Sequence, residues 1–300
     1  MGSNVLIAGA TGFVGSRLAA SFAGSEGRVR CLVRDRSKAG WLEEMGNEVW
    51  EADIGHPASL EGAGEGIDVA YFLVHSMAGG EGFAERERRG ARNFARMASR
   101  EGVQRVVYLG GLGEEDVSEH LRSRGETARV LAAAGPPLTY FRAAMVVGFG
   151  SESYRTLRYL VGRLPVMVAP AWLDTPTQPI GIEATVEYLR RALEVPESME
   201  AEVQIGGPDI LSYAEMLDRM ALAMGKRKPT KLRVPLLTPW LSSLWLGLVT
   251  PVDTKVARPL IEGLTTPTVV TDSAAAECFG ISPASFDKTL RAALAEEGER

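Results

Sequence analysis

The chain has 300 residues, 45% of them hydrophobic and 24% charged, which suits one large globular domain, alone or with a small annex, and excludes intrinsic disorder. Its formal net charge of −5 argues against a dedicated nucleic-acid-binding protein, which usually carries a strong basic excess. The two cysteines, Cys31 and Cys278, stand in neither a CxxC pattern nor a metal-ligand spacing, so we expect reduced thiols, no metal site and a cytoplasmic protein.

Short apolar segments alternate with helical patterns through the first half of the chain. The strand-like segments lie at 5–9, 29–33, 48–52, 68–74, 104–110 and 138–144. Helical patterns follow the first, second, fourth and fifth of these, at 13–22, 37–45, 81–102 and 118–135. Strands that alternate with helices of this length predict a parallel sheet covered on both faces, so we expect an α/β fold with a doubly wound sheet.

The alternation becomes less regular after about residue 150. Amphipathic helical patterns lie at 151–165, 183–195 and 212–225, and short strand-like segments at 203–207 and 231–235. We therefore expect residues 1–150 to form the sheet domain and residues 151–300 a smaller lobe packed on the carboxyl edge of the sheet.

The segment 234–249, VPLLTPWLSSLWLGLV, is rich in Leu and Trp but too short for a typical membrane span, and it carries two prolines near its start. A buried or domain-capping helix is the favoured interpretation. A helix at a membrane surface and a true span are the alternatives.

A glycine-rich turn, GATGFVG at 9–15, joins the first predicted strand to the first predicted helix. Its glycines have the roles of a dinucleotide-binding turn: Gly9 permits the tight turn, Gly12 lets the backbone approach a pyrophosphate, and Gly15 lets the helix pack closely on the strand. Free N–H groups at the helix start then face the phosphates. The strand–turn–helix context therefore predicts dinucleotide binding.

The residues after the second predicted strand bear on the choice between NADP and NAD. Arg34, Arg36 and Lys38 form a cationic cluster that suits a 2′-phosphate. Asp35 suits the ribose hydroxyls of NAD instead, so NADP is favoured while NAD stays open. Asp53, after the third predicted strand, suits either the adenine amine or a turn-making role.

Motifs along most of the chain resemble those of the atypical short-chain dehydrogenase/reductase family. They are GATGFVGSRLA, CLVRDRSK, ADI, AYFLVHSM, VVYLGGLG, HLRSRGE, LTYFRAAMVVGFGS and RLPVMVAPAW. Within that family the chain is similar to the bacterial YbjT-type subgroup, a relative of the NmrA-like regulators. The resemblance implies a Rossmann core, NAD(P) binding and a C-terminal substrate lobe. The reactions of the subgroup are largely undefined, so the resemblance implies no substrate.

Typical short-chain reductases use a Ser, a Tyr and a Lys, the last two spaced as YxxxK on the helix after the fifth strand. Here Gly110 and Gly111 stand near the Ser position, and His120 and Arg124 have the YxxxK spacing. A His can act as a general acid and an Arg can hold a ribose hydroxyl or a phosphate, although both also suit a solvated helix face. His75, after the fourth strand, is a second candidate for contact with a substrate carbonyl, or else a capping residue.

The expected site therefore contains two sets of residues. The catalytic candidates are His75, His120 and Arg124. The expected cofactor contacts are Gly9, Thr11, Gly12, Phe13, Val14, Gly15, Arg34, Lys38, Asp53, Ile54, Leu73, Val74, Leu109, Gly110 and Gly111. The charged helix 83–97 is expected to present a salt-bridged, solvated face.

These features favour an NADP(H)-dependent oxidoreductase that acts on a quinone or another apolar carbonyl compound without the usual Ser-Tyr-Lys triad. The first alternative is a non-catalytic NADP(H)-sensing or regulatory protein of NmrA-like type, which the loss of the triad favours. A weaker alternative is an isomerase or epimerase that keeps its nucleotide bound. The expected partner is a small-molecule substrate, not a nucleic acid. Contact with a membrane surface and the oligomeric state stay open.

Overall fold

Seven parallel strands form the central sheet of the structure, a computed structural model that describes residues 2–75, 82–113, 118–234 and 264–299. The sheet has the order β11-β6-β5-β4-β1-β2-β3. Its strands are β1 (Val5–Ala8), β2 (Val29–Val33), β3 (Glu48–Glu51), β4 (Val69–Phe72), β5 (Arg105–Gly111), β6 (Leu138–Ala143) and β11 (Glu202–Ile205). The order reverses direction between β1 and β4, as in a doubly wound fold, and the predicted fold class is confirmed.

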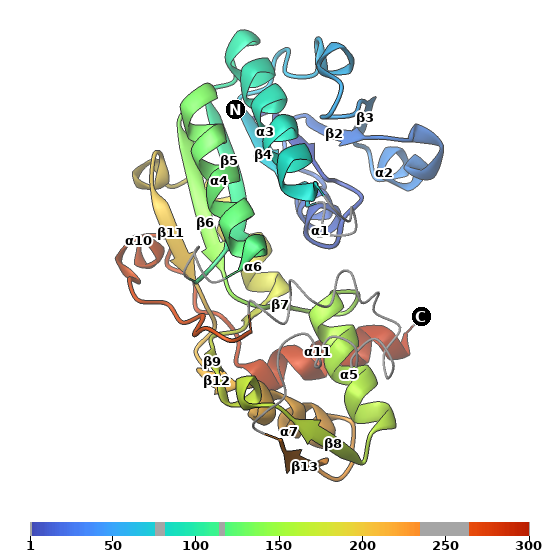
Figure 1. Ribbon diagram of the computed structural model, residues 1–300. Coiled ribbons are helices and arrows are strands. Elements are labelled where there is room, and N and C mark those ends of the chain that lie inside the picture. Colours follow the sequence, from blue (N-terminus) through green and yellow to red (C-terminus); the bar gives the residue numbers. More distant parts are fainter. Residues whose placement is uncertain (1, 76–81, 114–117, 235–263, 300) are drawn as a thin grey trace.

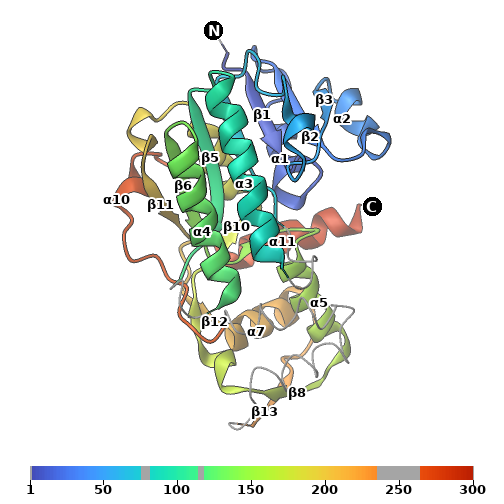
Figure 2. The ribbon, with the colours of Figure 1, turned by 45° about the horizontal axis from the view of Figure 1, so that its top comes forward.

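Helices cover both faces of this sheet (Figure 1). α3 (Phe83–Arg100) and α4 (Glu119–Ala134) lie side by side on one face, as Figure 2 also shows, and α1 (Phe13–Ser21) and α6 (Ile182–Arg191) cover the other. The short helix α2 (Gly40–Glu44) lies between β2 and β3 in the chain. β1 explains the unbroken apolar runs of the strands, because it is buried on both faces. Ile7 belongs to the same buried cluster as Leu18 on one face, and Leu6 to that of Phe94 on the other.

The smaller lobe has its own hydrophobic core, formed by three helices below the sheet in Figure 1. They are α5 (Glu152–Arg163), α7 (Tyr213–Ala223) and α11 (Phe286–Gly298). Short paired strands complete the lobe: β7 (Val146–Val147) with β10 (Ile180–Gly181), β8 (Val166–Ala169) with β13 (Thr230–Arg233), and β9 (Pro176–Thr177) with β12 (Leu211–Ser212). α10 (Ala274–Glu277) lies beside β11.

Residues from both halves of the chain build the central sheet. β11 pairs with β6 in parallel, with Val203 opposite Phe141, although it follows the helices of the smaller lobe in sequence. The predicted division at residue 150 stays a prediction, and the strand expected at 203–207 belongs to the sheet instead of the smaller lobe. Residues 235–249 of the apolar segment lie outside the described residues. Within the described part, no helix combines the length and apolar character needed to cross a bilayer.

Candidate functional site

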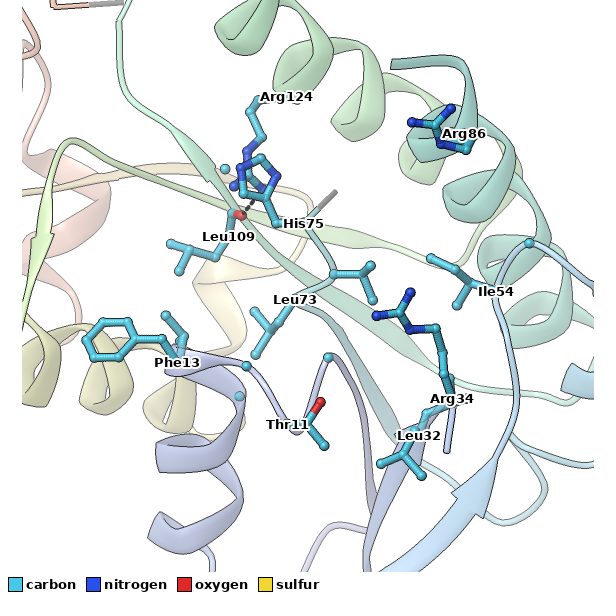
Figure 3. Close-up of a pocket in the computed structure, with 18 of the residues that line it drawn as sticks. Thr11, Phe13, Leu32, Arg34, Ile54, Leu73, His75, Arg86, Leu109 and Arg124 are labelled. Atoms are coloured by element: carbon cyan, nitrogen blue, oxygen red, sulfur yellow. Dashed lines mark hydrogen bonds between the residues drawn. The ribbon is translucent and has the colours of Figure 1, made fainter. Parts of the chain in front are cut away.

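A cavity of about 820 Å³ opens at the carboxyl ends of β1, β2, β4 and β5, where doubly wound sheets bind ligands. Its lining includes His75, His120, Arg124 and each expected cofactor residue except Lys38. Figure 3 shows residues from all four strand ends turned towards this space. The structure thus brings the sequence-predicted residues together, while their individual contacts with a cofactor stay predictions.

The glycine-rich turn is too tightly built for side chains at two of its three glycines. Gly9 has φ +89°, and a Cβ there would lie 2.7 Å from the Leu73 carbonyl oxygen. A Cβ on Gly15 would lie 2.2 Å from the Gly9 carbonyl oxygen. α1 begins after Gly12, and no side chain caps its first turn, so its N–H groups remain available to an anion. This cradle fits a dinucleotide pyrophosphate.

Past the end of β2, Arg34 lies at the cavity, whereas Asp35 and Lys38 pair with each other outside it. Arg34 lines the cavity. Asp35 accepts hydrogen bonds from the backbone and hydroxyl of Ser37, and its carboxylate lies 2.7 Å from Lys38 Nζ. The hydrogen bond from Lys38, followed by that from Ser37, lowers the pKa of Asp35. Lys38 is 80% exposed and does not line the cavity. Arg34 therefore lines the cavity while Asp35 is occupied within its own turn.

Past the end of β3, Asp53 also lines the cavity. Its Oδ1 accepts a hydrogen bond of 2.8 Å from the backbone N–H of Gly55, and its Oδ2 lies 3.3 Å from His56 Nδ1. The turn-making role considered for Asp53 is thus present, and its contact with an adenine amine stays a prediction.

Two arginines on α3 add positive charge to this end of the cavity. Arg86 and Arg89 line it, and Figure 3 draws Arg86 on the same side as Arg34 and Ile54. Both side chains are exposed, in line with the expected solvated face, and that expectation is wrong for Glu87 on the same helix, which is buried. The sequence alternates acidic and basic residues here, and only the packing of α3 shows that Glu87 turns inwards.

The opposite end of the cavity holds a buried polar cluster. His75 Nδ1 lies 3.2 Å from Oε1 of Glu87, a residue only 2% exposed, and Oε2 of Glu87 accepts a 2.7 Å hydrogen bond from Ser123 Oγ. The ring of His120 lies 5.0 Å from that of His75. Arg124 Nη1 donates to the Leu109 carbonyl at 3.4 Å. The His120 and Arg124 pair thus lies in the cavity wall and not on a solvated face.

Small residues occupy the strand end beside this cluster for a steric reason. A Cβ on Gly110 would lie 2.6 Å from the Tyr140 ring, and one on Gly111 would lie 2.7 Å from Leu121 Cδ2. Any larger residue at either position, including a serine, would require these side chains to move. The packing of Tyr140 and Leu121 therefore explains the two glycines.

Residues 9–140 match the family model described as NAD(P)H-binding. This part of the chain is an NAD(P)H-binding domain. The match confirms the predicted NAD(P) binding and agrees with the resemblance to NAD(P)-binding Rossmann proteins.

Proteins similar to the chain include reductases. A ceramide reductase from Caulobacter vibrioides is 27% identical over 77% of this chain and 73% of its own length. The photosystem II assembly factor Ycf39 from Cyanophora paradoxa is 26% identical over 63% of this chain and 58% of its own length. The NADPH-bound quinone oxidoreductase QOR2 from Escherichia coli has a similar fold, with a TM-score of 0.77 and 18% identity over 95% of this chain and 98% of that chain.

Burial sets the protonation of the cluster in the NAD(P)H-binding domain. Desolvation, aided by the Arg124 charge, lowers the pKa of His75 to about 4 and that of His120 to about 3. Burial alone would raise the pKa of Glu87, but the His75 hydrogen bond and the Arg124 charge outweigh it and bring it to about 2. Near neutral pH, both rings are therefore uncharged and Glu87 is ionised.

We expect this cluster to make stability depend on pH between the ordinary pKa of His, 6.5, and about 4. In that window the unfolded chain binds a proton at His75 and the folded chain does not, so the free energy of unfolding falls as the pH falls. The expected loss is on the order of 2 kcal/mol. Urea unfolding at pH 7 and pH 4.5 should show a smaller fall for His75→Gln than for the wild type. Equal falls would contradict the assignment.

Proposed function

We propose that the protein is an NADPH-dependent oxidoreductase that reduces an apolar carbonyl compound or a quinone. The observation that carries the proposal is a single cavity with an anion cradle at one end and a buried His–Glu–Arg cluster at the other. The similarity to a ceramide reductase and to a quinone oxidoreductase supports the same class of chemistry.

NADPH, when bound, supplies a hydride. The protein's own residues bind and orient both reactants and transfer one proton. Leu73, Val74 and Leu109 give the cavity an apolar wall that favours an apolar substrate. His75 is the proposed carrier of the proton at the substrate oxygen, with His120 beside it, and Arg124 is the proposed partner of a polar group on the ligand.

The preference for NADPH over NADH is proposed from Arg34. Its guanidinium lines the cavity while Asp35 is held by Lys38 and Ser37, so no carboxylate competes for the 2′ position from this turn. Arg34→Ala is expected to raise the Kd for NADPH about 10- to 100-fold and to leave the Kd for NADH within about 2-fold, because charge-assisted hydrogen bonds are worth roughly 1.5–3 kcal/mol. Fluorescence titration measures both constants.

Arg36→Ala is the matched control for Arg34→Ala. Arg36 lies two residues further along the same turn, pairs with Glu43 and is 59% exposed, outside the cavity lining. Its replacement is expected to leave both constants unchanged. Equal losses of NADPH and NADH affinity in Arg34→Ala would remove the 2′-phosphate role.

The function itself is tested by following NADPH oxidation with a panel of quinones, long-chain ketones and aldehydes. Turnover with apolar members, and little with small polar ones, is the expected result. The competing proposal is a non-catalytic NADP(H)-sensing protein. It is favoured by the absence of Tyr and Lys at His120 and Arg124 and by the similarity to an assembly factor. Tight NADPH binding without turnover on any member of the panel would favour it.

A further inference from the structure

We propose that Glu87 is a positioning residue that fixes the neutral His75 ring in its Nδ1–H tautomer and leaves the Nε2 lone pair to accept a hydrogen bond from a ligand hydroxyl. The inference deepens the proposed oxidoreductase function and rests on it for the role of His75. It gives a role to the buried carboxylate of Glu87, for which the sequence predicted a solvated helix face.

The hydrogen bonds of Glu87 define the tautomer. Its two oxygens face His75 Nδ1 at 3.2 Å and Ser123 Oγ at 2.7 Å. An ionised carboxylate only accepts hydrogen bonds, so His75 Nδ1 must carry the proton for that contact to be favourable. In a neutral imidazole the other nitrogen then has no hydrogen, and Nε2 presents a lone pair.

The charges around His75 keep Glu87 ionised. Arg124 and His120 from α4 and Tyr108 from β5 are the other titratable groups of the cluster, and only Arg124 among them is charged near neutral pH. A buried carboxylate costs several kcal/mol unless nearby groups compensate it. Arg124 and the two hydrogen bonds provide that compensation, so the tautomer of His75 is set by a charge that persists at working pH.

Three atoms of the cluster show what the ligand must offer. His75 Nε2, His120 Nδ1 and Arg124 Nε are buried and make no hydrogen bond, and all three residues line the cavity. A buried polar atom left unpaired costs about 1–3 kcal/mol. Arg124 Nε can only donate, and His75 Nε2 in this tautomer can only accept. A hydroxyl group both donates and accepts, so its chemistry matches the two atoms, whereas a carbonyl or a carboxylate only accepts.

This arrangement allows His75 to transfer the proton in both the reduction and the reverse oxidation. In the reduction, hydride adds to the carbonyl carbon, the C=O π pair takes the proton from a protonated Nε2, and His75 returns to its neutral Nδ1–H form beside the new hydroxyl. Solvent supplies the proton that first reaches Nε2. A nicotinamide ribose hydroxyl offers the same donor and acceptor as the alcohol product, and the kinetic test below separates these two sources.

The tautomer can be measured directly on the wild-type protein, without turnover. The sequence contains three histidines, so long-range ¹H–¹⁵N spectra of ¹⁵N-labelled protein at pH 7 show three rings, assigned with His56→Gln and His120→Gln. The expected result is a protonated Nδ1 and an unprotonated Nε2 for His75. An Nε2–H tautomer in the wild type would overturn the proposal, even if the protein proves to be an active reductase.

Glu87→Gln tests the cause, because its amide can also donate to Nδ1 and no longer requires the Nδ1–H form. The expected results are a mixture of His75 tautomers, a kcat lower by about 10- to 100-fold and an altered pH profile. Glu87→Asp keeps the buried charge and is expected to recover part of the kcat. A His75 spectrum unchanged in Glu87→Gln would contradict the proposal.

Glu126→Gln is the matched control, since Glu126 pairs with Arg88 between the same two helices and does not line the cavity. Its kcat is expected to stay close to that of the wild type. An equal loss in both variants would mean that helix packing, not ring orientation, is affected, and would overturn the proposal. A rise in the Kd for NADPH together with the fall in kcat assigns the hydroxyl to the nicotinamide ribose. A fall in kcat with an unchanged Kd for NADPH assigns it to the substrate.

Discussion

Gly15→Ala is expected to raise the Kd for NADPH at least 100-fold and to lower the free energy of unfolding by about 3 kcal/mol. The added Cβ would lie 2.2 Å from the Gly9 carbonyl oxygen and 2.8 Å from its carbonyl carbon. Both are backbone atoms, so no side chain can rotate away and the phosphate-binding turn itself must move. Fluorescence titration with NADPH and urea unfolding measure the two effects.

Gly40→Ala is the control for this substitution. Gly40 is the first residue of α2, and a Cβ there would meet nothing within 4 Å. NADPH affinity is expected to be unchanged and stability equal or slightly higher, because Ala favours a helix more than Gly does. A Gly15→Ala protein that still bound NADPH with wild-type affinity would show that the turn does not need the close approach of helix and strand.

His75→Gln is expected to lower kcat by about 10²- to 10⁴-fold while the Kd for NADPH stays within a few-fold. Gln keeps much of the volume of the ring and can still bond to Glu87, but it cannot accept and return a proton. Steady-state rates with the best substrate of the panel give kcat, and NADPH titration shows that the variant is folded and binds the cofactor. Undiminished turnover would exclude His75 as the proton carrier and move the assignment to His120.

The alternation of strands and helices and the glycine-rich turn could be predicted because both depend on local sequence. β1 and β4 are buried on both faces, so the sequence shows unbroken apolar runs such as Val5–Ala8. Gly9 and Gly15 occupy positions where any side chain would meet backbone, and the spacing alone indicates that constraint. The strands predicted in the first half occur in the structure, most with ends that differ by one or two residues.

The acidic part of the site could not be predicted, because it depends on how α3 packs against α4. Glu87 lies between Arg86 and Arg88 in a run of charges, and sequence periodicity gave no reason to separate it from the exposed Glu85. The sequence holds only a weak signal for the buried side of this helix, namely the small residues Gly90 and Ala91, which pack closely in the structure. Lys38 is the opposite case. The sequence predicts a phosphate contact for this basic residue, but in the structure it pairs with Asp35 and does not line the cavity.

The late position of β11 in the chain has a consequence for synthesis on the ribosome. Its partner β6 ends at Ala143, and the last paired residue of β11 is Ile205, roughly 60 residues later. At about 5–20 residues per second, the β6 edge emerges about 3–12 s before the strand that covers it. An unpaired edge can recruit other strands during that interval. The nascent chain therefore passes through a stage in which association with other nascent chains competes with completion of its own sheet.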